Sequence, residues 1–593
     1  MTEPTADSSL PLEQWQAIAE KSQRLMRDFV ARQGDGVGQN DDMKRMNDVF
    51  MQATMQLLSD PAKLAEAQAS LWKGYMDLWQ NTALRMAGQE VDPVVLPHSD
   101  DRRFKHDSWT ENAVFDYMKQ SYLLSSNWVT ELMGGVDGLE PKTKKQLDFY
   151  TRLYVDALSP TNFAATNPEV LRETAETKGE NLVRGLSNLL DDFERGKGQL
   201  AIKMVDNDAF EVGKDLATTP GKVVFQNDLI QLIQFTPTTQ KVHRKPLLIV
   251  PPWINKYYIL DLKPKNSFIK WVVEQGHTVF VVSWVNPDAE LARKTFSDYL
   301  LEGPMAAIDA VEKATGEKKI NVLGYCIGGT LVACTMAYMA ANKDNHVASA
   351  SYLTSLVDFK NVGEIDVFID EEQVQNLERM MEERGFLEGS EMAATFNTLR
   401  ANDLVWSFVI NNYLMGKEPF PFDILYWNGD STRMPAAMHS EYLRRMYLDN
   451  ALSQGKMELA GTTLDLTAIK TPSYLLSTRE DHIAPWDSTY KATQLYSGKT
   501  TFTLAMSGHV AGVVNPAAKD KYGYWTNASN PESTEAWLEG AEQHDGSWWP
   551  HWQAWLAKHA GAMVPARQPG DGALEVLEDA PGSFVKHDLR KAG

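Results

Sequence analysis

The stretch Gly324-Tyr325-Cys326-Ile327-Gly328-Gly329-Thr330 follows directly on the apolar run INVL at 320–323. This pattern predicts a tight turn from a strand into a helix, with Cys326 at its tip and glycines leaving room for a strained backbone. It corresponds to G-x-S-x-G with cysteine in place of serine. The positive end of the following helix would stabilise a thiolate, and the N–H of Ile327 would face an oxyanion. A free cysteine can also be a small core residue, so the interpretation requires partner residues.

Short apolar runs alternate with helical stretches on both sides of this turn. The pattern predicts a parallel sheet that helices cover on both faces, an α/β fold. The expected strands lie in KVVFQN, LIQLIQFTP, PLLIVPPW, TVFVVSWV, INVLGYC, SASYLTSLVDF, TPSYLLSTRED and TTFTLAMSGH, and helices are expected in SFIKWVVEQG and FSDYLLEGPMAAIDAVEKATG.

Residue composition and the pattern of apolar residues divide the chain into four parts. We expect a flexible segment at 1–40, an all-helical domain at 41–205, an α/β domain at 206–565 and a loosely ordered tail at 566–593. Within the α/β domain the alternation stops at about 360–450, which predicts an apolar insertion over the sheet. The helical part includes one stretch that begins with Pro61 after a cap at Ser59 or Asp60. Its three- and four-residue steps predict one apolar stripe made of Leu64, Leu71, Trp72, Tyr75, Leu78 and Trp79.

A carboxylate and an imidazole follow the last two predicted parallel strands. Asp481 ends the run SYLLSTRED, and His509 follows TFTLAMSG. Nucleophile, acid and histidine then occur in the order found in α/β-hydrolases. We expect His509 to take the proton of Cys326 and Asp481 to orient His509. His482 competes for the role of base, and we prefer His509 because it lies in the turn where the order places it.

The loop after the strand PLLIV is expected to supply a second oxyanion donor. It begins with two prolines, which cannot donate, so the N–H of Trp253 or of Ile254 is the candidate. Asn255 would orient this loop, contact substrate or simply cap a turn.

Charge and cysteine content exclude several classes of function. A net charge of −21 argues against broad nucleic-acid or anionic-membrane binding. Two cysteines, of which Cys334 is interpreted as core, exclude a disulfide framework and a cysteine-rich zinc site, so no metal is expected. No signal peptide or apolar run of membrane-spanning length is apparent, which predicts a cytoplasmic protein.

Several motifs together resemble those of the polyhydroxyalkanoate synthases, and most closely those of class I, the single-subunit type. The resemblance covers nearly the whole chain. It is carried by DRRFKHDSW at 101–109, FDYMKQSYLL at 115–124, SPTNFAATNPEVL at 159–171, VPPWINKYYILDL at 250–262, GYCIGGT at 324–330, NDLVWSFVINNYL at 402–414, YWNGDSTRMP at 426–435, STREDHIAPW at 477–486, SGHVAGVVNP at 507–516 and APGSFVK at 580–586. Trp253 departs from this family, in which a smaller residue often occupies the position.

The resemblance implies an α/β-hydrolase domain with a lid, preceded by a helical domain, in a homodimer at the surface of polyester granules. It implies the catalytic roles of Cys326, Asp481 and His509. The expected reaction polymerises (R)-3-hydroxyacyl-CoA, of short acyl length, onto a growing polyester chain. Coenzyme A leaves as a product, and no separate cofactor is expected. His509 or Asp481 would deprotonate the attacking hydroxyl.

Two further expectations concern the pocket and the competing reaction. Ala511 lies where pocket size is set, and His482 and Asn255 are candidate substrate contacts. The alternative function is a cysteine-dependent esterase or thioesterase with the same three residues, in which water replaces the hydroxyl of the monomer.

Overall fold

The computed structural model describes residues 38–588 except 100, 197 and 199, together with residues 21 and 590. Most of the expected flexible segment at 1–40 therefore lies outside the described residues. Among the described residues the chain forms two compact units, one helical and one α/β. The helical unit extends to Asp206 and also takes in Phe396–Phe420, and the α/β unit contains Asn207–Thr395 and Pro421 onward.

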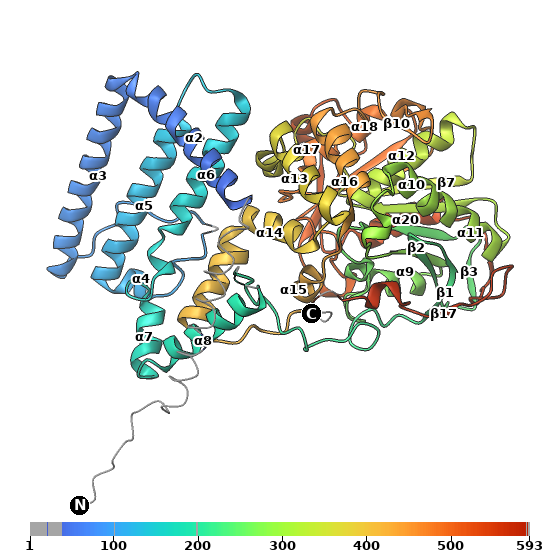
Figure 1. Cartoon of the computed structure of the whole chain (residues 1–593), viewed down its shortest axis with the longest axis horizontal. Coiled ribbons are helices and arrows are strands. Elements are labelled where there is room, and N and C mark those ends of the chain that lie inside the picture. The colour runs from blue at the N-terminus through green and yellow to red at the C-terminus, as the bar shows by residue number, and fades with distance from the viewer. Residues whose placement is uncertain are drawn as a thin grey trace, which may run out of the picture. The chain divides into compact units, whose positions relative to one another are not determined.

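The helical unit is built on α3 (Pro61–Met86), which packs on α5 (Ala113–Gly134) (Figure 1). Asp60 caps α3 by accepting a hydrogen bond from the N–H of Lys63, and Pro61 occupies its first turn as predicted. The expected single stripe on α3 is wrong, however. Leu78 is buried, whereas Trp72 and Trp79 are 72% exposed on another side of the helix. The other helices of this unit are α2 (Gly38–Leu58), α4 (Ser108–Glu111), α6 (Pro141–Ala157), η1 (Pro160–Asn162), α7 (Pro168–Glu176) and α8 (Glu180–Arg195).

Part of the expected insertion belongs to the helical unit, which corrects the predicted division at 360–450. The segment carries η6 (Asn402–Trp406) and η7 (Val409–Leu414), and η7 packs on α8. Gly185 permits this approach, since a Cβ there would lie 1.8 Å from the carbonyl oxygen of Tyr413. Asn181 donates a hydrogen bond of 2.8 Å to the carbonyl of Leu414. Sequence separation hid this pairing, because more than two hundred residues lie between the two segments.

Among the described residues, eleven strands of the α/β unit form one mixed sheet in the order β15-β14-β13-β12-β7-β6-β4-β5-β2-β1-β17. The central strands from β13 to β5 are parallel, as the alternation of strands and helices predicts, and the strands at both sides are antiparallel. The strands are β1 (Gly221–Gln226), β2 (Ile230–Phe235), β4 (Leu247–Val250), β5 (Val279–Trp284), β6 (Ile320–Tyr325), β7 (Val347–Leu353), β12 (Ser473–Thr478), β13 (Thr500–Ala505), β14 (Gly523–Thr526), β15 (Glu542–Asp545) and β17 (Glu578–Asp579).

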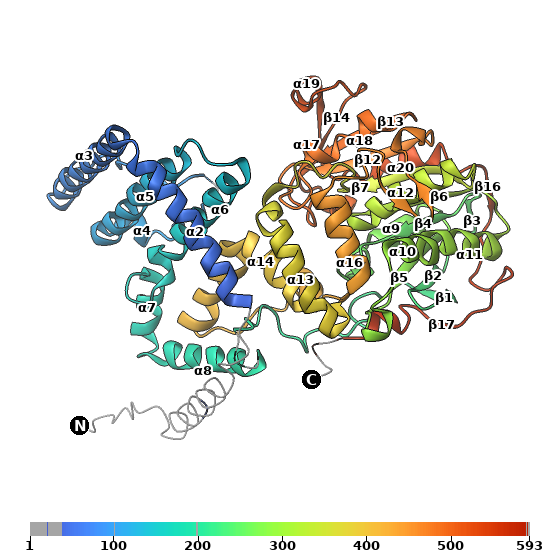
Figure 2. The ribbon, with the colours of Figure 1, turned by 45° about the horizontal axis from the view of Figure 1, so that its top comes forward.

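Helices cover both faces of this sheet. Along the sheet, the chain moves from β4 to β5 in one direction and from β5 to β6 and then to β7 in the opposite direction. Because such crossovers between parallel strands are right-handed, α9 lies on one face of the sheet, and α11 and α12 lie on the other. Phe268 of α9 packs against Trp549 and Trp552 of α20, which therefore shares the face of α9. Figure 2 shows α12 alongside β6 and β7. These helices are α9 (Phe268–Glu274), α11 (Ala306–Thr315), α12 (Ile327–Ala341) and α20 (Trp549–Ala557).

Shorter elements complete the α/β unit. They are β3 (Lys241–His243), η2 (Tyr257–Asp261), η3 (Ala289–Leu291), α10 (Phe296–Leu300), η4 (Leu301–Met305), η5 (Gly363–Phe368), α13 (Glu371–Arg384), β8 (Phe386–Leu387), α15 (Asp423–Gly429), β9 (Met434–Pro435), α16 (Ala436–Tyr442), η8 (Leu443–Leu448), β10 (Glu458–Leu459), β11 (Thr462–Thr463), η9 (Leu466–Ala468), α17 (Trp486–Thr489), α18 (Ala492–Leu495), η10 (Ala517–Lys519), α19 (Thr534–Glu539), β16 (Met563–Pro565) and η11 (Phe584–Lys586), while α14 (Gly389–Leu399) spans the boundary of the two units.

The expected loosely ordered tail is wrong for the described residues of 566–593. β17 adds to the edge of the sheet, where Lys222 pairs with Asp579. Val585 is buried in η11, and the side chain of Gln231 accepts a hydrogen bond from the N–H of Phe584. The glycines and prolines of this segment form turns between anchored pieces, and β17 covers a strand edge that would otherwise be open.

Candidate active site

Cys326 occupies the turn between β6 and α12. Its φ of 54° and ψ of −128° are strained for a residue with a side chain. The neighbouring glycines make the turn possible, because a Cβ on Gly324 would lie 2.3 Å from Cα of Gly329. A Cβ on Gly328 would lie 2.3 Å from the carbonyl oxygen of Val250. The turn therefore presses directly on the end of β4 and holds the cysteine at the carboxyl edge of the sheet.

Asp481 and His509 meet at the same edge, beyond β12 and β13. Nδ1 of His509 lies 2.7 Å from Oδ2 of Asp481, and both side chains are buried. The other carboxylate oxygen of Asp481 accepts the N–H groups of Ile483 and Ala484, each at 2.9 Å. Thr478 donates its hydroxyl to Oδ2 at 3.0 Å. Four donors thus fix the carboxylate in one orientation toward the imidazole.

Electrostatics link Cys326 to this pair. Burial disfavours a charged imidazole, but the carboxylate of Asp481, the thiolate of Cys326 and hydrogen bonds to both side chains raise the pKa of His509 well above its usual value. Burial also disfavours the carboxylate, yet the charge and hydrogen bond of His509 and the backbone donors hold the pKa of Asp481 below its usual value. The raised pKa favours an imidazolium on His509, which lies between the carboxylate of Asp481 and the side chain of Cys326.

The loop after β4 carries the other predicted residues. Trp253 is buried, and its ring packs against Tyr299 at 5.0 Å and Trp284 at 5.5 Å. Ile254 follows it, and Asn255 forms an isolated antiparallel bridge with Ser431. Because Val250 pairs with Gly324 and the carbonyls of Val250 and Pro251 lie against Gly328, this loop begins beside the cysteine turn. The large indole that departs from the family thus points into an aromatic core.

The remaining predicted residues have different surroundings. Of the two candidate histidines, His509 hydrogen-bonds to Asp481. The carbonyl oxygen of His482 lies against Gly363, 3.0 Å from where a Cβ on that glycine would be. Ala511 is half-buried two residues beyond His509. Cys334 is fully buried on α12, and burial raises the pKa of its thiol well above the usual value.

Sequence reasoning missed three tyrosines near the cysteine. Tyr325 donates a hydrogen bond to the carbonyl of His509 at 3.1 Å. Tyr442 and Tyr447 have hydroxyls 3.5 Å apart. Burial is the main reason that the pKa of both is raised, that of Tyr447 to about 12; Tyr447 raises the pKa of Tyr442 further, and Cys326 makes a smaller contribution in the same direction to both. Tyr325 stands next to the cysteine and was open to inference, whereas Tyr442 and Tyr447 come from a helical region without a local signature.

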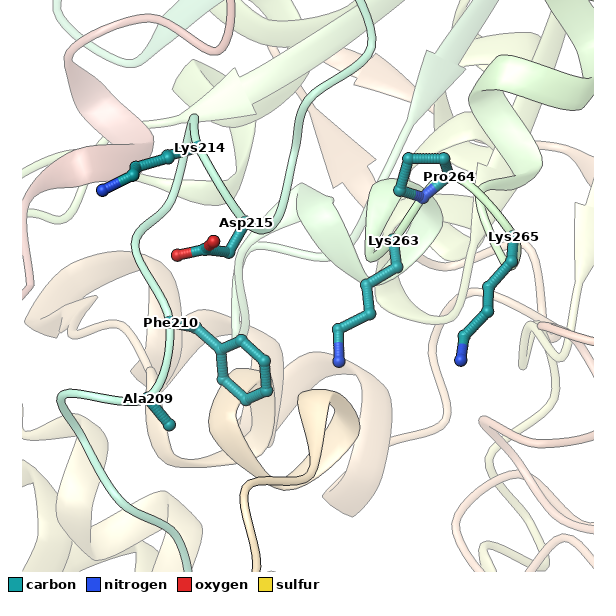
Figure 3. A pocket seen from close by; sticks show the side chains of 7 residues that line it. All are labelled: Ala209, Phe210, Lys214, Asp215, Lys263, Pro264 and Lys265. Atoms are coloured by element: carbon teal, nitrogen blue, oxygen red, sulfur yellow. The ribbon is translucent and has the colours of Figure 1, made fainter.

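An open hollow of about 590 Å³ lies elsewhere on the α/β unit (Figure 3). Its lining includes three lysines, and two of them already have partners: Lys263 lies 4.4 Å from the ring of Phe210, and Lys214 lies 3.5 Å from Glu211. None of the residues around Cys326 lines this hollow, so we assign it no step of the chemistry. It is lined by Ala209, Phe210, Lys214, Asp215, Lys263, Pro264 and Lys265.

In the part of the chain that the structure describes, no cluster of three or more His, Cys, Asp or Glu side chains is arranged to hold a metal ion. None of the helices in that part combines the length and apolar character needed to span a membrane.

The strand order, the cysteine turn after β6 and the acid and histidine after β12 and β13 define an α/β-hydrolase fold with Cys326 at the strand-to-helix turn. Residues 246–516 match the family model described as alpha/beta hydrolase fold. Residues 100–272 match the model described as Poly-beta-hydroxybutyrate polymerase (PhaC) N-terminus. This PhaC N-terminus model covers part of the helical unit and part of the α/β unit, so one family model matches residues of both.

Curated relatives identify that family. The poly(3-hydroxyalkanoate) polymerase of Methylorubrum extorquens is 50% identical over 89% of this chain and 88% of its own length. The poly(3-hydroxyalkanoate) polymerase subunit PhaC of Rhizobium meliloti (strain 1021) is 48% identical over 89% and 86%. The chain belongs to the poly(3-hydroxyalkanoate) polymerase family.

One solved structure shows a more distant likeness. The monoacylglycerol lipase of Paleococcus ferrophilus is 14% identical, with a TM-score of 0.32 over 56% of this chain and 99% of the lipase. The fold assignment rests on the sheet order and the family model rather than on this superposition.

Proposed function

We propose that this protein polymerises (R)-3-hydroxyacyl-CoA into a polyhydroxyalkanoate polyester and releases CoA, with Cys326 as the covalent acyl carrier. The observation that carries the proposal is the chain of contacts from Cys326 through His509 to Asp481. It lies at three strand ends in a protein half identical to a poly(3-hydroxyalkanoate) polymerase. A cysteine suits this reaction, because thiolate attack on a thioester exchanges one thioester for another at little cost.

Acylation begins with attack of the Cys326 thiolate on the thioester carbonyl. A carbon–sulfur bond to the enzyme forms, the bond to CoA breaks, and the CoA thiolate takes its proton from the His509 imidazolium. The N–H of Ile327 and that of Trp253 or Ile254 stabilise the oxyanion between these two events. Product CoA then leaves, and the acyl group remains on Cys326.

Transfer to a 3-hydroxyl completes the cycle. The hydroxyl oxygen of a monomer or of the growing chain forms an ester bond with the acyl carbon, the carbon–sulfur bond to Cys326 breaks to restore the thiolate, and a base takes the hydroxyl proton. The surroundings favour His509 over Asp481 as that base. Both oxygens of Asp481 already accept hydrogen bonds, two from main-chain N–H groups and two from His509 and Thr478. Asp481 keeps the imidazole in position and stabilises its positive charge.

One experiment separates this reaction from hydrolysis. Purified protein is incubated with (R)-3-hydroxybutyryl-CoA, and released CoA, free hydroxy acid and insoluble polyester are measured together. Polyester in proportion to CoA supports the proposal. Free hydroxy acid as the sole acyl product would instead establish a cysteine-dependent thioesterase, and absence of CoA release would remove both functions.

The proposal extends to the polyester granule as the place of action. Three apolar side chains on α3 recur at four- and three-residue steps and are 68–72% exposed, namely Trp72, Met76 and Trp79. Such a stripe suits the surface of an apolar polymer. Replacing all three by serine is expected to lower binding to purified polyester particles in a sedimentation assay. Leu577→Ser, which removes a single exposed apolar side chain, provides the control.

Dimerisation, a lid and a cytoplasmic location complete the proposal, and all three rest on the family. Light scattering with and without (R)-3-hydroxybutyryl-CoA tests the homodimer, since substrate is expected to increase the dimer fraction. The lid role falls to the apolar part of 360–450. A fluorescent fusion is expected to colocalise with polyester granules inside the cell, and a diffuse signal in cells that contain granules would contradict that location.

A further inference from the structure

The loop after β4 is fastened to α15 and to the segment that follows it. The indole N–H of Trp427 donates to the carbonyl of Lys256 at 2.7 Å. The N–H of Thr432 donates to the carbonyl of Ile254 at 3.2 Å, and its hydroxyl donates to the carbonyl of Trp253. The carbonyl oxygens of Trp253, Ile254 and Lys256 are therefore held, and the same contacts restrict the orientation of the peptide groups between them.

A buried ion pair lies at the centre of this junction. Nζ of Lys256 is 2.6 Å from Oδ1 of Asp430, and the two side chains are 3% and 2% exposed. Lys256 also donates to the carbonyl of His587 at 2.8 Å, and Tyr258 donates to Oδ2 of Asp430 at 2.9 Å. The pair thus joins the loop, the segment after α15 and the C-terminal segment at one point.

Because the pair is buried, removal of only one of its two members is expected to destabilise the protein. Burial lowers the pKa of Lys256 and raises the pKa of Asp430, and the charge of the partner acts against each shift. Loss of Lys256 leaves Asp430 with a more distant cation, Arg590 at 3.8 Å from Oδ2, whereas loss of both members of the pair removes the desolvation cost together with the attraction. Comparing single and double substitutions can therefore separate the effect of the pair on stability from its effect on the position of the loop.

The loop held in this way is the one beside the nucleophile. Val250 pairs with Gly324 in neighbouring parallel strands, and Gly328 of the cysteine turn packs on the carbonyls of Val250 and Pro251. A shift of the loop would move the N–H groups of Trp253 and Ile254 relative to the carbonyl that Cys326 attacks. Donors act on an oxyanion only when they are already at hydrogen-bond distance from it.

We propose that Lys256 and Asp430 are positioning residues that hold the loop of Trp253 and Ile254 at the oxyanion formed during acylation of Cys326. The inference rests on the proposed acyl transfer and adds the requirement that this ion pair, outside the reacting residues, holds the loop in place. Lys256→Met is expected to lower the rate of CoA release from (R)-3-hydroxybutyryl-CoA about 10- to 100-fold. Alkylation of Cys326 by iodoacetamide, which forms no oxyanion, is expected to stay within about threefold of the unmodified protein.

A double variant and a matched control distinguish position from stability. Lys256→Met with Asp430→Leu is expected to recover much of the thermal stability lost in Lys256→Met, while CoA release stays low. Lys119→Met breaks another buried lysine–aspartate pair, that of Lys119 and Asp116 at 2.9 Å in the helical unit, and is expected to affect stability without the selective loss of acylation.

The outcomes also separate this inference from the proposed function. If the unmodified protein releases no CoA, the proposed function fails. If it does, and the double variant releases CoA within about twofold of it, the pair has only a structural role and the inference is overturned. An equal fall of CoA release and of Cys326 alkylation in the folded double variant would overturn it as well.

Discussion

The hydroxyl of Tyr325 donates a hydrogen bond to the main-chain carbonyl of His509 at 3.1 Å. The two rings also stack, with centroids 5.6 Å apart and planes 24° from parallel. The residue directly before Cys326 therefore supports the loop that carries the histidine. This contact couples the cysteine turn on β6 to the loop after β13, across the intervening strands of the sheet.

Tyr325→Phe tests this coupling by removing one oxygen atom. We expect a loss of about 1 kcal/mol in the free energy of unfolding, because the carbonyl of His509 loses its donor. We also expect a fall of about 3- to 10-fold in kcat with little change in KM, since the imidazole loses positional restraint. Thermal unfolding and the rate of CoA release measure the two effects.

Tyr474→Phe is the matched control for that variant. Its hydroxyl is also buried and lies 2.9 Å from Nδ1 of His551, remote from the three catalytic positions in the sequence. A similar loss of stability with an unchanged kcat is expected. Equal kcat values in all three proteins would show that the Tyr325 hydroxyl has no role in placing His509.

The two cysteines are expected to differ sharply on substitution. Cys326→Ala removes the proposed acyl carrier and should abolish acylation, and Cys326→Ser should retain little because an alkoxide is poorly accessible near neutral pH. Cys334→Ala leaves a small cavity, costs about 1 kcal/mol of stability and should keep activity. Mass spectrometry of protein quenched during turnover detects the acyl group. An inactive but folded Cys334→Ala variant would refute the assignment of Cys334 to the core.

Monomer preference provides a test of the half-buried Ala511. A larger side chain there is expected to crowd the acyl group, so Ala511→Ser should favour the shorter of two monomers and Ala511→Gly the longer, each by about 3- to 10-fold. The ratio of kcat/KM for 3-hydroxybutyryl-CoA and 3-hydroxyhexanoyl-CoA measures this. Constant ratios across the three proteins would remove Ala511 from the pocket.

The sequence predicted the parallel sheet, because its signals are local. Each of Cys326, Asp481 and His509 stands just after an apolar run, and the rule that parallel strands end at one edge brings them together. Such local rules could not predict the tertiary packing. Nothing near Lys256 indicates Asp430, and the outward direction of Trp72 depends on which face of α3 meets α5. The ordered C-terminal segment was missed because its composition suits turns, while its anchoring comes from the distant residues Gln231 and Lys256.

Gly328 is expected to tolerate no side chain. A Cβ there would lie 2.3 Å from the carbonyl oxygen of Val250 and 2.6 Å from that of Pro251, both of which belong to rigid main chain. Gly328→Ala should therefore destabilise the protein by about 2 kcal/mol or more and distort the cysteine turn. Gly134→Ala, where the added atom meets nothing within 4 Å, is the control and should be close to neutral. Denaturant unfolding of both variants checks the difference, and equal midpoints would contradict it.

The pair of His509 and Asp481 predicts how stability depends on pH. The pKa of His509 is raised in the folded protein, so its contribution is complete below the unfolded value of about 6.5 and is lost as pH rises through the folded value. The pKa of Asp481 is lowered, so its contribution is present above the unfolded value of about 3.9 and is lost as pH falls through the folded value. The ion pair therefore stabilises the fold most at mildly acidic pH.

His509→Gln removes the titrating imidazole and should flatten this dependence. We expect the difference in Tm between the unmodified protein and His509→Gln to be larger at about pH 6 than at about pH 10, since the contribution of the imidazolium is complete at the lower pH and falls as pH rises. His551→Gln is the control, because burial lowers the pKa of that histidine and the sign of its contribution is opposite. A Tm difference for His509→Gln that grows as pH rises would contradict the raised pKa of His509 in the folded protein.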